Sequence, residues 1–397
     1  MEQVSDRLAR LTASATIAMN QRSKDLQAEG IDVINLSVGE PDFNTPDHIK
    51  EAAKKAIDDN FSFYPPVAGY PALKKAIVQK LKEQNGLDYT PDQIVVSNGA
   101  KHSIVNVLLS IINAGDEVII PAPYWVSYAE QVKISEGTNV FLDTDIDNDF
   151  KVTPEQVQQA ITPRTRAIML CSPSNPSGCV YSKDELEGLA AVLAPHERII
   201  IISDEIYEHI NYVGKHESIA QFDGVRDRVV LVNGVSKGYA MMGWRLGYMA
   251  APPWIAKAVT KLQGQFTSGV TTVGQIAAIT ALTGDQGPTR EMNKAFRRRR
   301  DLVLGHLDGI EGVKCSVPEG AFYVFPDMSA YFEKSVEGKK IRDSGDLCMY
   351  LLESGHIATV PGSAFGAPDC VRISFATSDE NLEKAMIRLK NALAKMS

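Results

Sequence analysis

The chain has 397 residues, of which 44% are hydrophobic and 23% are charged, and this composition excludes disordered, collagen-like and coiled-coil proteins. Its 41 basic and 49 acidic residues give a formal net charge of −8, so we expect no nucleic acid and no anionic membrane as a primary partner. A few local cations would still suffice to bind a small anion, and the length favours one large domain plus a smaller one.

Neither a disulfide framework nor a metal site is predicted. The five cysteines are scattered and odd in number, and no two of them form a C-x-x-C pair. Residues 1–20 contain no continuous apolar core of the kind found in a signal peptide, and the longest apolar runs are far shorter than the roughly 20 residues that span a bilayer. These features predict a cytoplasmic protein without a membrane segment.

Short β-branched runs alternate with longer amphipathic segments through the middle of the chain. In chain order, strands are expected at 94–97, 117–120, 167–171, 199–202 and 229–232, with a helix at 100–112 after the first of them. The runs at 199–202 and 229–232 are continuously apolar, which is typical of strands covered by helices on both faces. The pattern predicts an α/β fold around a mostly parallel sheet.

The last third of the chain has a different pattern. A helix is expected at 287–307, followed by strand-like segments at 320–325, 357–360 and 371–376 and a closing helix from about 380. We therefore expect an N-terminal arm that forms part of the small domain (1–45), a large domain (46–288) and a small C-terminal α+β domain (289–397). The four arginines 297–300 point around the circumference of their helix, so we expect a solvated surface there and not a nucleic-acid site.

The segment 229–248, VVLVNGVSKGYAMMGWRLGY, is the most informative for chemistry. A buried strand and a small-residue turn place Lys237 at the carboxyl edge of the sheet, where open α/β sheets bind ligands. A lysine amine attacks carbonyl groups when its pKa is lowered, and Ser236 and Arg245 nearby suit a phosphate. The alternative is a solvated loop lysine.

A second polar group follows the strand at 199–202 in the segment IIIISDEIY. Asp204 should reach the same sheet edge as Lys237, and a carboxylate among so much apolar surface needs a cation or a donor, such as a protonated heterocyclic nitrogen. Tyr207 can place its phenol on the same face if a turn follows the strand. Alternatively, Asp204 caps a helix and Tyr207 lies in the core.

The turn from the strand at 94–97 into the following helix predicts an anion site. Gly99 and Ala100 are small, so the backbone N–H groups at the helix start are accessible to an anion. Lys101 in the first helical turn opposes the helix dipole, a cost that a bound anion would offset. An ordinary surface lysine is the alternative.

Three more side chains are candidates at this edge. Asn175, in the rigid turn CSPSNPSG, offers an amide to a phenolate-like oxygen or a carboxylate, although the segment also reads as a simple turn. Trp125 follows the strand at 117–120 and could stack on a flat ring. Arg372 in VRISF could hold a carboxylate through two hydrogen bonds, or it could be a surface residue.

Together these segments resemble the class I aminotransferases of the fold type I pyridoxal-phosphate (PLP) superfamily. The resemblance extends from about residue 14 to the C-terminus and rests on spaced motifs: VGEPD at 38–42, Tyr64 with Gly69, PYW at 123–125, NPSG at 175–178, SDEIY at 203–207, SK at 236–237 with GWR at 243–245, and Arg372. It implies PLP as cofactor and a mostly parallel, seven-stranded type of sheet with helices on both faces, next to a smaller α+β domain.

The resemblance also implies a role for each motif residue. Lys237 would bond covalently to PLP and later act as the catalytic base, while Asp204 would pair with the pyridinium nitrogen. The phenolic oxygen of PLP would be bonded by Tyr207 and Asn175, and its ring would be stacked on Trp125. The phosphate would lie against Gly99, Ala100, Lys101, Ser236 and Arg245.

Two further implications concern the partner subunit and the substrate. Tyr64 would reach the phosphate in the neighbouring subunit's site, which implies a homodimer. The amino acid and 2-oxo acid substrates would be held by Arg372, Asn175, Gly39, Trp125 and Lys101, with Arg372, Asn175 and the Gly39 backbone on the α-carboxylate.

The chain is most similar to the bacterial branch of aspartate aminotransferases, through SAT at 14–16, GAK at 99–101 and WVSY at 125–128. In that branch a lysine at the position of Lys101 binds the distal carboxylate, so we expect ping-pong transfer between aspartate and 2-oxoglutarate. Thr12 stands where prephenate-accepting relatives tend to have a basic residue, and Gly234 where many members have a phosphate-binding hydroxyl. An aromatic, prephenate or broad-range aminotransferase and a PLP-dependent lyase are the alternatives.

Overall fold

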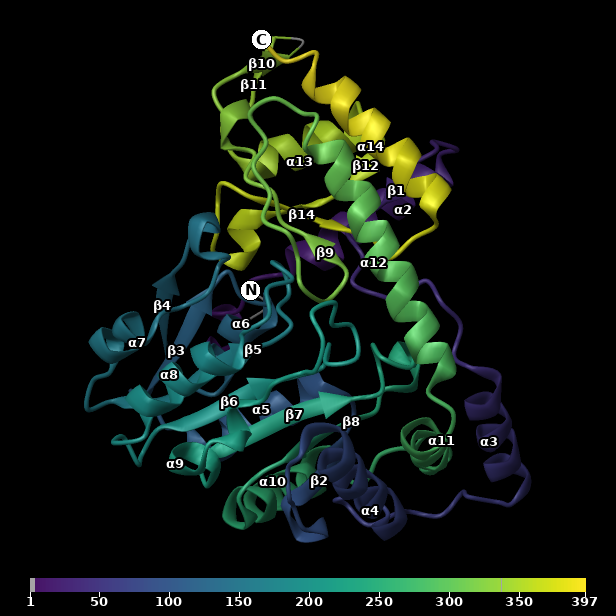
Figure 1. Ribbon diagram of the computed structural model, residues 1–397, viewed down its shortest axis with the longest axis vertical. Helices are drawn as coiled ribbons and strands as arrows, with labels where there is room; N and C mark the ends of the chain where they lie inside the picture. The colour runs from purple at the N-terminus through teal and green to yellow at the C-terminus, as the bar shows by residue number, and fades with distance from the viewer. Residues whose placement is uncertain (1–3, 337) are drawn as a thin grey trace.

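The computed structural model describes residues 4–336 and 338–397, and its largest feature is a seven-stranded sheet (Figure 1). The strands lie in the order β2 (Ile94–Ser97), β8 (Gly247–Ala250), β7 (Val229–Gly234), β6 (Ile200–Asp204), β5 (Thr165–Cys171), β3 (Glu117–Ala122) and β4 (Thr138–Asp143). Only β8 runs antiparallel to its neighbours within this sheet. The expected α/β fold with a mostly parallel sheet is therefore confirmed.

Helices cover both faces of the sheet, which explains the continuously apolar strands. One face packs against α5 (Ala100–Ile111), α6 (Ser127–Ile134) and α10 (Pro253–Phe266). The other face packs against a larger set of helices: α3 (Asp47–Asp58), α4 (Pro71–Lys80), α7 (Pro154–Ala160), α8 (Lys183–Leu193), α9 (Asp223–Arg226) and α11 (Thr272–Thr283). Successive strand residues alternate between the two cores: Ile200 and Ile202 belong to the first, Ile201 to the second.

Segments from both ends of the chain share a separate core. Strand β1 (Ile34–Asn35) pairs in parallel with β12 (Ile357–Ala358), and a three-stranded sheet consists of β13 (Val360–Pro361), β14 (Val371–Ser374) and β9 (Tyr323–Val324). Strands β10 (Ser335–Val336) and β11 (Lys339–Lys340) form a hairpin. The helices of this part are α2 (Ala15–Ala28), α12 (Gly287–Leu307), α13 (Ser344–Glu353) and α14 (Asp379–Leu393), while the short α1 (Asp6–Ala9) contacts α6 of the large sheet. In Figure 1 the long helix α12 extends from the level of the large sheet into the core formed by both chain ends.

Two strands of the large sheet are absent from the sequence-based expectation. Strand β4 lies at the sheet edge, has no buried residue and has polar residues at both ends of its sequence TNVFLD, so its apolar run is short. Strand β8 has four residues, GYMA, and follows a glycine-rich segment that reads as a loop. Both are recognised only through their hydrogen-bonded neighbours.

The arginine run of α12 is only in part the solvated surface that the sequence suggested, because Arg297 and Arg298 are exposed but the next two arginines are not. Arg299 is buried, donates two hydrogen bonds to the carboxylate of Asp42 at 2.7 and 2.9 Å, and also contacts Asp379. Arg300 is buried against the Tyr212 ring and donates to the Pro318 carbonyl oxygen. The two arginines are buried because the middle turns of α12 pack against the core formed by both chain ends and against the segment around residue 42.

Candidate active site

A cavity of about 530 Å³ opens at the carboxyl ends of β5, β6 and β7. Residues from α2, from the start of α5 and from β14 also line it, so both ends of the chain contribute. Its lining includes four cationic side chains, Lys101, Lys237, Arg245 and Arg372, and two carboxylates, Glu40 and Asp204. An acidic protein thus contains a locally cationic cavity, as suits an anionic ligand.

Lys237 lies three residues beyond the end of β7 and projects into the cavity. Its Nζ atom donates a hydrogen bond to the Gly39 carbonyl oxygen at 2.6 Å. Burial, together with the nearby Arg372 and Arg245, lowers the pKa of the Lys237 amine to about 8, against the opposing effects of Glu40 and Asp204. A far larger fraction of this amine is therefore neutral, and nucleophilic, near physiological pH than of a lysine in solvent.

Asp204 is the last residue of β6 and is buried on the cavity floor. Burial raises the pKa of its carboxyl to about 6, while hydrogen bonds from the Tyr128 hydroxyl at 2.6 Å and the Ile206 backbone N–H oppose that rise. A cation or protonated ring nitrogen in the cavity would favour the ionised form. Tyr128 was not predicted as a site residue, although it lies only three residues after Trp125, in the first turn of α6.

Tyr207 also faces the cavity, from the turn after β6. Its hydroxyl lies 2.9 Å from that of Tyr323, the first residue of β9, and both phenols are buried. Burial raises the pKa of both tyrosines, so both are neutral hydrogen-bonding groups. Sequence reasoning missed Tyr323, because nothing in a two-residue strand distinguishes a site residue from a core residue.

The start of α5 lies beside the cavity as expected. Gly99 is the residue before the helix and has φ of 87°, a conformation that favours glycine, and an added Cβ would lie 2.5 Å from Nη2 of Arg245. Ala100 and Lys101 line the cavity, and the first N–H groups of a helix have no acceptor within it. Ser236 and Arg245 line the same cavity, so these groups together form an anion-binding corner.

Arg372 projects from β14 and is fully buried. Its guanidinium donates to Asn175 Oδ1 at 2.9 Å and to the Ser37 carbonyl oxygen at 2.6 Å, and it lies 4.6 Å from the Tyr323 ring centroid. Its Nε atom is buried without a hydrogen-bond partner. An uncompensated donor of this kind is costly unless a ligand accepts from it.

Trp125 and Lys101 lie together on the cavity wall, with the Lys101 ammonium 4.9 Å from the Trp125 ring centroid. Partial burial and the nearby Arg245 lower the pKa of Lys101. Helix α2 and the residue before it contribute Ser14, Thr16, Ile17 and Asn20 to the lining, none of which was predicted as a site residue.

The predicted site residue Tyr64 does not line the cavity. It is 96% exposed, next to Phe63, which is 82% exposed. Two adjacent aromatic rings in solvent are unusual for a monomer surface and are typical of a protein contact.

Comparison with known proteins identifies the family. Residues 31–389 match the family "Aminotransferase class I and II". An aspartate aminotransferase of Geobacillus stearothermophilus is 46% identical over 385 residues, which cover 96% of this chain and 97% of the relative. The aspartate/prephenate aminotransferase of Nitrosomonas europaea is 45% identical over 395 residues, 98% of this chain and 100% of the relative.

A solved structure agrees with this result. The crystal structure of the aspartate aminotransferase from Rhizobium meliloti matches with a TM-score of 0.97 and 43% identity, covering 100% of both chains. The chain therefore belongs to the class I and II aminotransferases. It is a PLP-dependent transaminase, as the sequence motifs predicted.

The side chains around the cavity fit this cofactor. The cavity offers an amine for its aldehyde, a buried carboxylate for its ring nitrogen and a cationic helix start for its phosphate. Among the described residues, no helix combines the length and apolar character needed to cross a membrane.

Proposed function

We propose that this enzyme is an aspartate:2-oxoglutarate aminotransferase whose cofactor and substrates bind in the cavity around Lys237. One observation carries the proposal. The amine with a lowered pKa shares its cavity with two separate cationic positions, Arg372 on β14 and Lys101 on α5, as a dicarboxylate substrate requires. The relatives named aspartate aminotransferase support the same substrate class.

In this proposal Lys237 would form the covalent bond to the aldehyde carbon of the cofactor, Asp204 would pair with the ring nitrogen, and Tyr207 and Asn175 would donate to the phenolic oxygen. Trp125 would stack on the ring. The phosphate would be held by the backbone at the α5 start, namely Gly99, Ala100 and Lys101, and by Ser236 and Arg245, with Tyr64 from a second subunit.

When bound, PLP supplies an aldehyde and an electron-withdrawing ring that stabilises negative charge at the substrate α-carbon. The residues of this chain do the rest. The Lys237 amine, when free, would act as the general base that holds and moves the α-proton. The Asp204 carboxylate would keep the ring nitrogen protonated, and the buried Arg372, with Asn175 and the Gly39 backbone, would orient the α-carboxylate.

We assign substrate specificity to the part of the cavity that Lys101 and Trp125 line. The Lys101 ammonium would donate to the distal carboxylate of aspartate or glutamate, which accounts for a cation in the first turn of a helix. A second candidate function, prephenate transamination, is favoured by the name of the Nitrosomonas relative. Against it, Thr12 carries no charge and its backbone N–H donates to Glu130.

The oligomeric state, the domain boundaries and the cellular location belong to the same proposal. The exposed Phe63 and Tyr64 support a homodimer in which Tyr64 completes the neighbouring site. The two separate cores support a large domain at 46–288 and a small domain from 1–45 and 289–397. Five free cysteines support a reducing, cytoplasmic location.

Aspartate added to the purified PLP-loaded enzyme tests the proposal. The visible cofactor band should be lost as oxaloacetate forms, and 2-oxoglutarate should restore it. A panel of kcat/KM values over aspartate, glutamate, tyrosine and alanine, with prephenate as acceptor, then ranks the substrates. Absence of any cofactor band would overturn the assignment, and release of ammonia without an acceptor would favour a lyase.

A further inference from the structure

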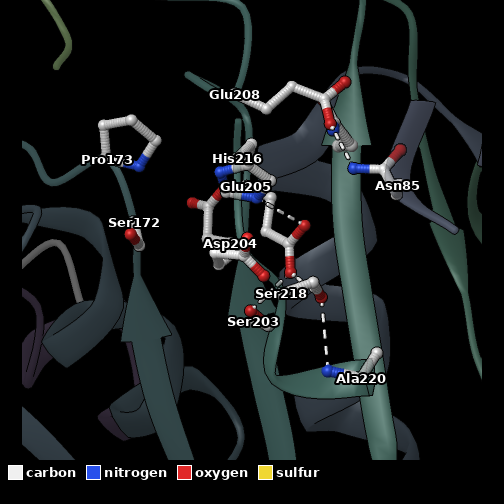
Figure 2. Close-up of polar contacts among 12 residues, drawn as sticks. Asn85, Ser172, Pro173, Ser203, Asp204, Glu205, Glu208, His216, Ser218 and Ala220 are labelled. Atoms are coloured by element: carbon white, nitrogen blue, oxygen red, sulfur yellow. Dashed lines mark hydrogen bonds and ion pairs between the residues drawn. The ribbon is translucent and has the colours of Figure 1, made fainter. Parts of the chain in front are cut away.

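The turn that carries Asp204 and Tyr207 has a second, buried polar side. Asp204 and Tyr207 face the cavity, whereas the intervening Glu205 and the following Glu208 do not line it. Both glutamates are buried, at 1% and 7% exposure. Figure 2 shows Glu205 and Glu208 with Asn85, His216 and Ser218 gathered beside Asp204. Two buried carboxylates behind a catalytic turn are costly unless they are neutralised.

Glu205 is held by three side chains. Its Oε1 accepts hydrogen bonds from the Ser203 hydroxyl at 2.9 Å and the Ser218 hydroxyl at 2.6 Å, and its Oε2 lies 2.8 Å from His216 Nε2. His216 is also buried, and burial alone would lower the pKa of its imidazole. The charge of Glu205 and the hydrogen bond to it outweigh that effect and raise the pKa of His216.

Glu208 is neutralised by a different cation. It forms a buried ion pair with Lys80, the last residue of α4, and its Oε2 accepts from Asn85 Nδ2 at 3.0 Å. Lys80 in turn donates to Asn85 Oδ1 at 2.9 Å. His209 lies 3.2 Å from Glu208, but burial lowers its pKa to about 4, so that imidazole is neutral.

The cluster is therefore balanced in charge by protein groups. Ligand atoms of Glu205, Glu208 and His216 lie within 4.8 Å of one another, a spacing that a metal ion could use. The Lys80 ammonium already supplies the positive charge at this position, so the geometry gives no reason to add an ion. The groups that act on His216 are Glu205, Glu208, Lys80 and His209.

We propose that the residues of two buried ion pairs, Glu205–His216 and Glu208–Lys80, are positioning residues for transamination. They hold the turn at 204–208 in place from the side that faces away from the cavity, and they determine the electrostatic potential at Asp204. Four segments meet at the cluster, namely α4, the short π-helix Leu81–Asn85 that follows it, the catalytic turn and residues 216–218. The Glu205 charge is among the causes that raise the pKa of Asp204, so the coupling reaches the cavity. The inference rests on the proposed contact between Asp204 and the cofactor ring nitrogen.

Two matched substitutions test the charge coupling in the PLP-loaded enzyme. Glu205→Gln removes a negative charge and should lower the pH midpoint of the visible absorption change of the bound cofactor. His216→Gln removes a positive charge and should raise it, each by about half a pH unit or more. Glu217→Gln, a carboxylate beside the cluster that accepts from Gln221 instead, should leave the midpoint unchanged.

Opposite shifts cannot come from a general loss of packing, so they would establish the inference. Shifts of the same sign, or shifts no larger than in Glu217→Gln, would overturn it while leaving the cofactor assignment intact. Failure of the wild-type enzyme to show a cofactor band would instead overturn the proposed function itself.

A charge-neutral variant covers the case in which single substitutions prevent folding. The double variant Glu205→Gln/His216→Gln leaves no buried unpaired charge at this pair and should fold. Its absorption midpoint should return toward the wild-type value, while kcat falls at least about fivefold because the turn loses charge-assisted hydrogen bonds. A kcat equal to that of Glu217→Gln would show that the pair only stabilises the fold, which would overturn the inference.

Discussion

At the scale of single residues, the site depends on an amine whose proton affinity is set by its surroundings. Lys237 is held against the Gly39 carbonyl oxygen in a cavity lined by further cations, and burial lowers its pKa to about 8. The same lysine in solvent would be almost fully protonated at neutral pH.

This pKa predicts how the apoenzyme takes up its cofactor. Only the neutral amine reacts with an aldehyde, so the rate of covalent PLP attachment should rise about tenfold per pH unit up to about pH 8 and level off above it. Stopped-flow absorbance measures this profile. Lys237→Ala should bind PLP only noncovalently and lose at least about a thousandfold in turnover. Lys133→Ala, a surface control, should keep the wild-type profile, and a midpoint near the ordinary lysine pKa would contradict the prediction.

Lys101 predicts a selective effect on substrates. Lys101→Ala should lower kcat/KM for aspartate and glutamate about 10- to 100-fold, because a hydrogen bond to a charged group is lost, and should change alanine less than about twofold. Lys101→Arg should recover part of the dicarboxylate activity. An equal loss for all substrates would place Lys101 on the phosphate instead.

At the scale of elements, α12 is tied to the segment that supplies Gly39. Arg299 on this helix binds Asp42 through two hydrogen bonds and stacks 5.1 Å from the Phe43 ring centroid. Its neighbour Arg298 is exposed and donates two hydrogen bonds to the carboxylate of Asp379. Two adjacent arginines of one helix thus have different environments.

The difference predicts unequal losses of stability. Arg299→Leu should lower the free energy of unfolding by about 2–4 kcal/mol, because Asp42 loses its partner in a partly buried site. Arg298→Leu should cost less than about 1 kcal/mol, as expected for an exposed ion pair. Denaturant titration of both variants measures the difference, and equal losses would show that Arg299 contributes no more than a surface residue.

At the scale of the whole molecule, the exposed Tyr64 predicts sites shared between subunits. Tyr64→Ala should weaken PLP binding about tenfold, the loss expected for one hydrogen bond to a charged phosphate. Equilibrium dialysis measures this, while sedimentation should still show a dimer.

Mixed dimers give the sharper measurement. A heterodimer of Tyr64→Ala and Lys237→Ala chains should contain one intact site, because Lys237 and Tyr64 of that site come from different chains. Activity after mixing should therefore exceed the sum of the two separate variants. Simple additivity would mean that Tyr64 acts within its own chain or not at all.

Much of the fold was predictable because its signals are local. Long apolar runs identified the central strands, and α12 begins and ends where the sequence indicated, at Gly287–Leu307. Strands β4 and β8 were not predictable, because β4 contains polar and exposed residues and β8 follows a glycine-rich segment, whereas the equally short β2 has an apolar run. The buried half of the arginine run was missed because the environment of Arg299 depends on Asp42, 257 residues away.

The sequence by itself determined the family and the chemical groups of this protein, because its motifs lie at strand ends where the polypeptide must present side chains to one sheet edge. Only the tertiary structure decided what surrounds those groups. It placed the Tyr323 and Tyr128 hydroxyls beside Tyr207 and Asp204, and it buried Arg372 with its Nε unpaired. It also located the Glu205–His216 and Glu208–Lys80 pairs behind the catalytic turn. Desolvation and long-range contact set these properties, and neither is encoded in the spacing of residues along the chain.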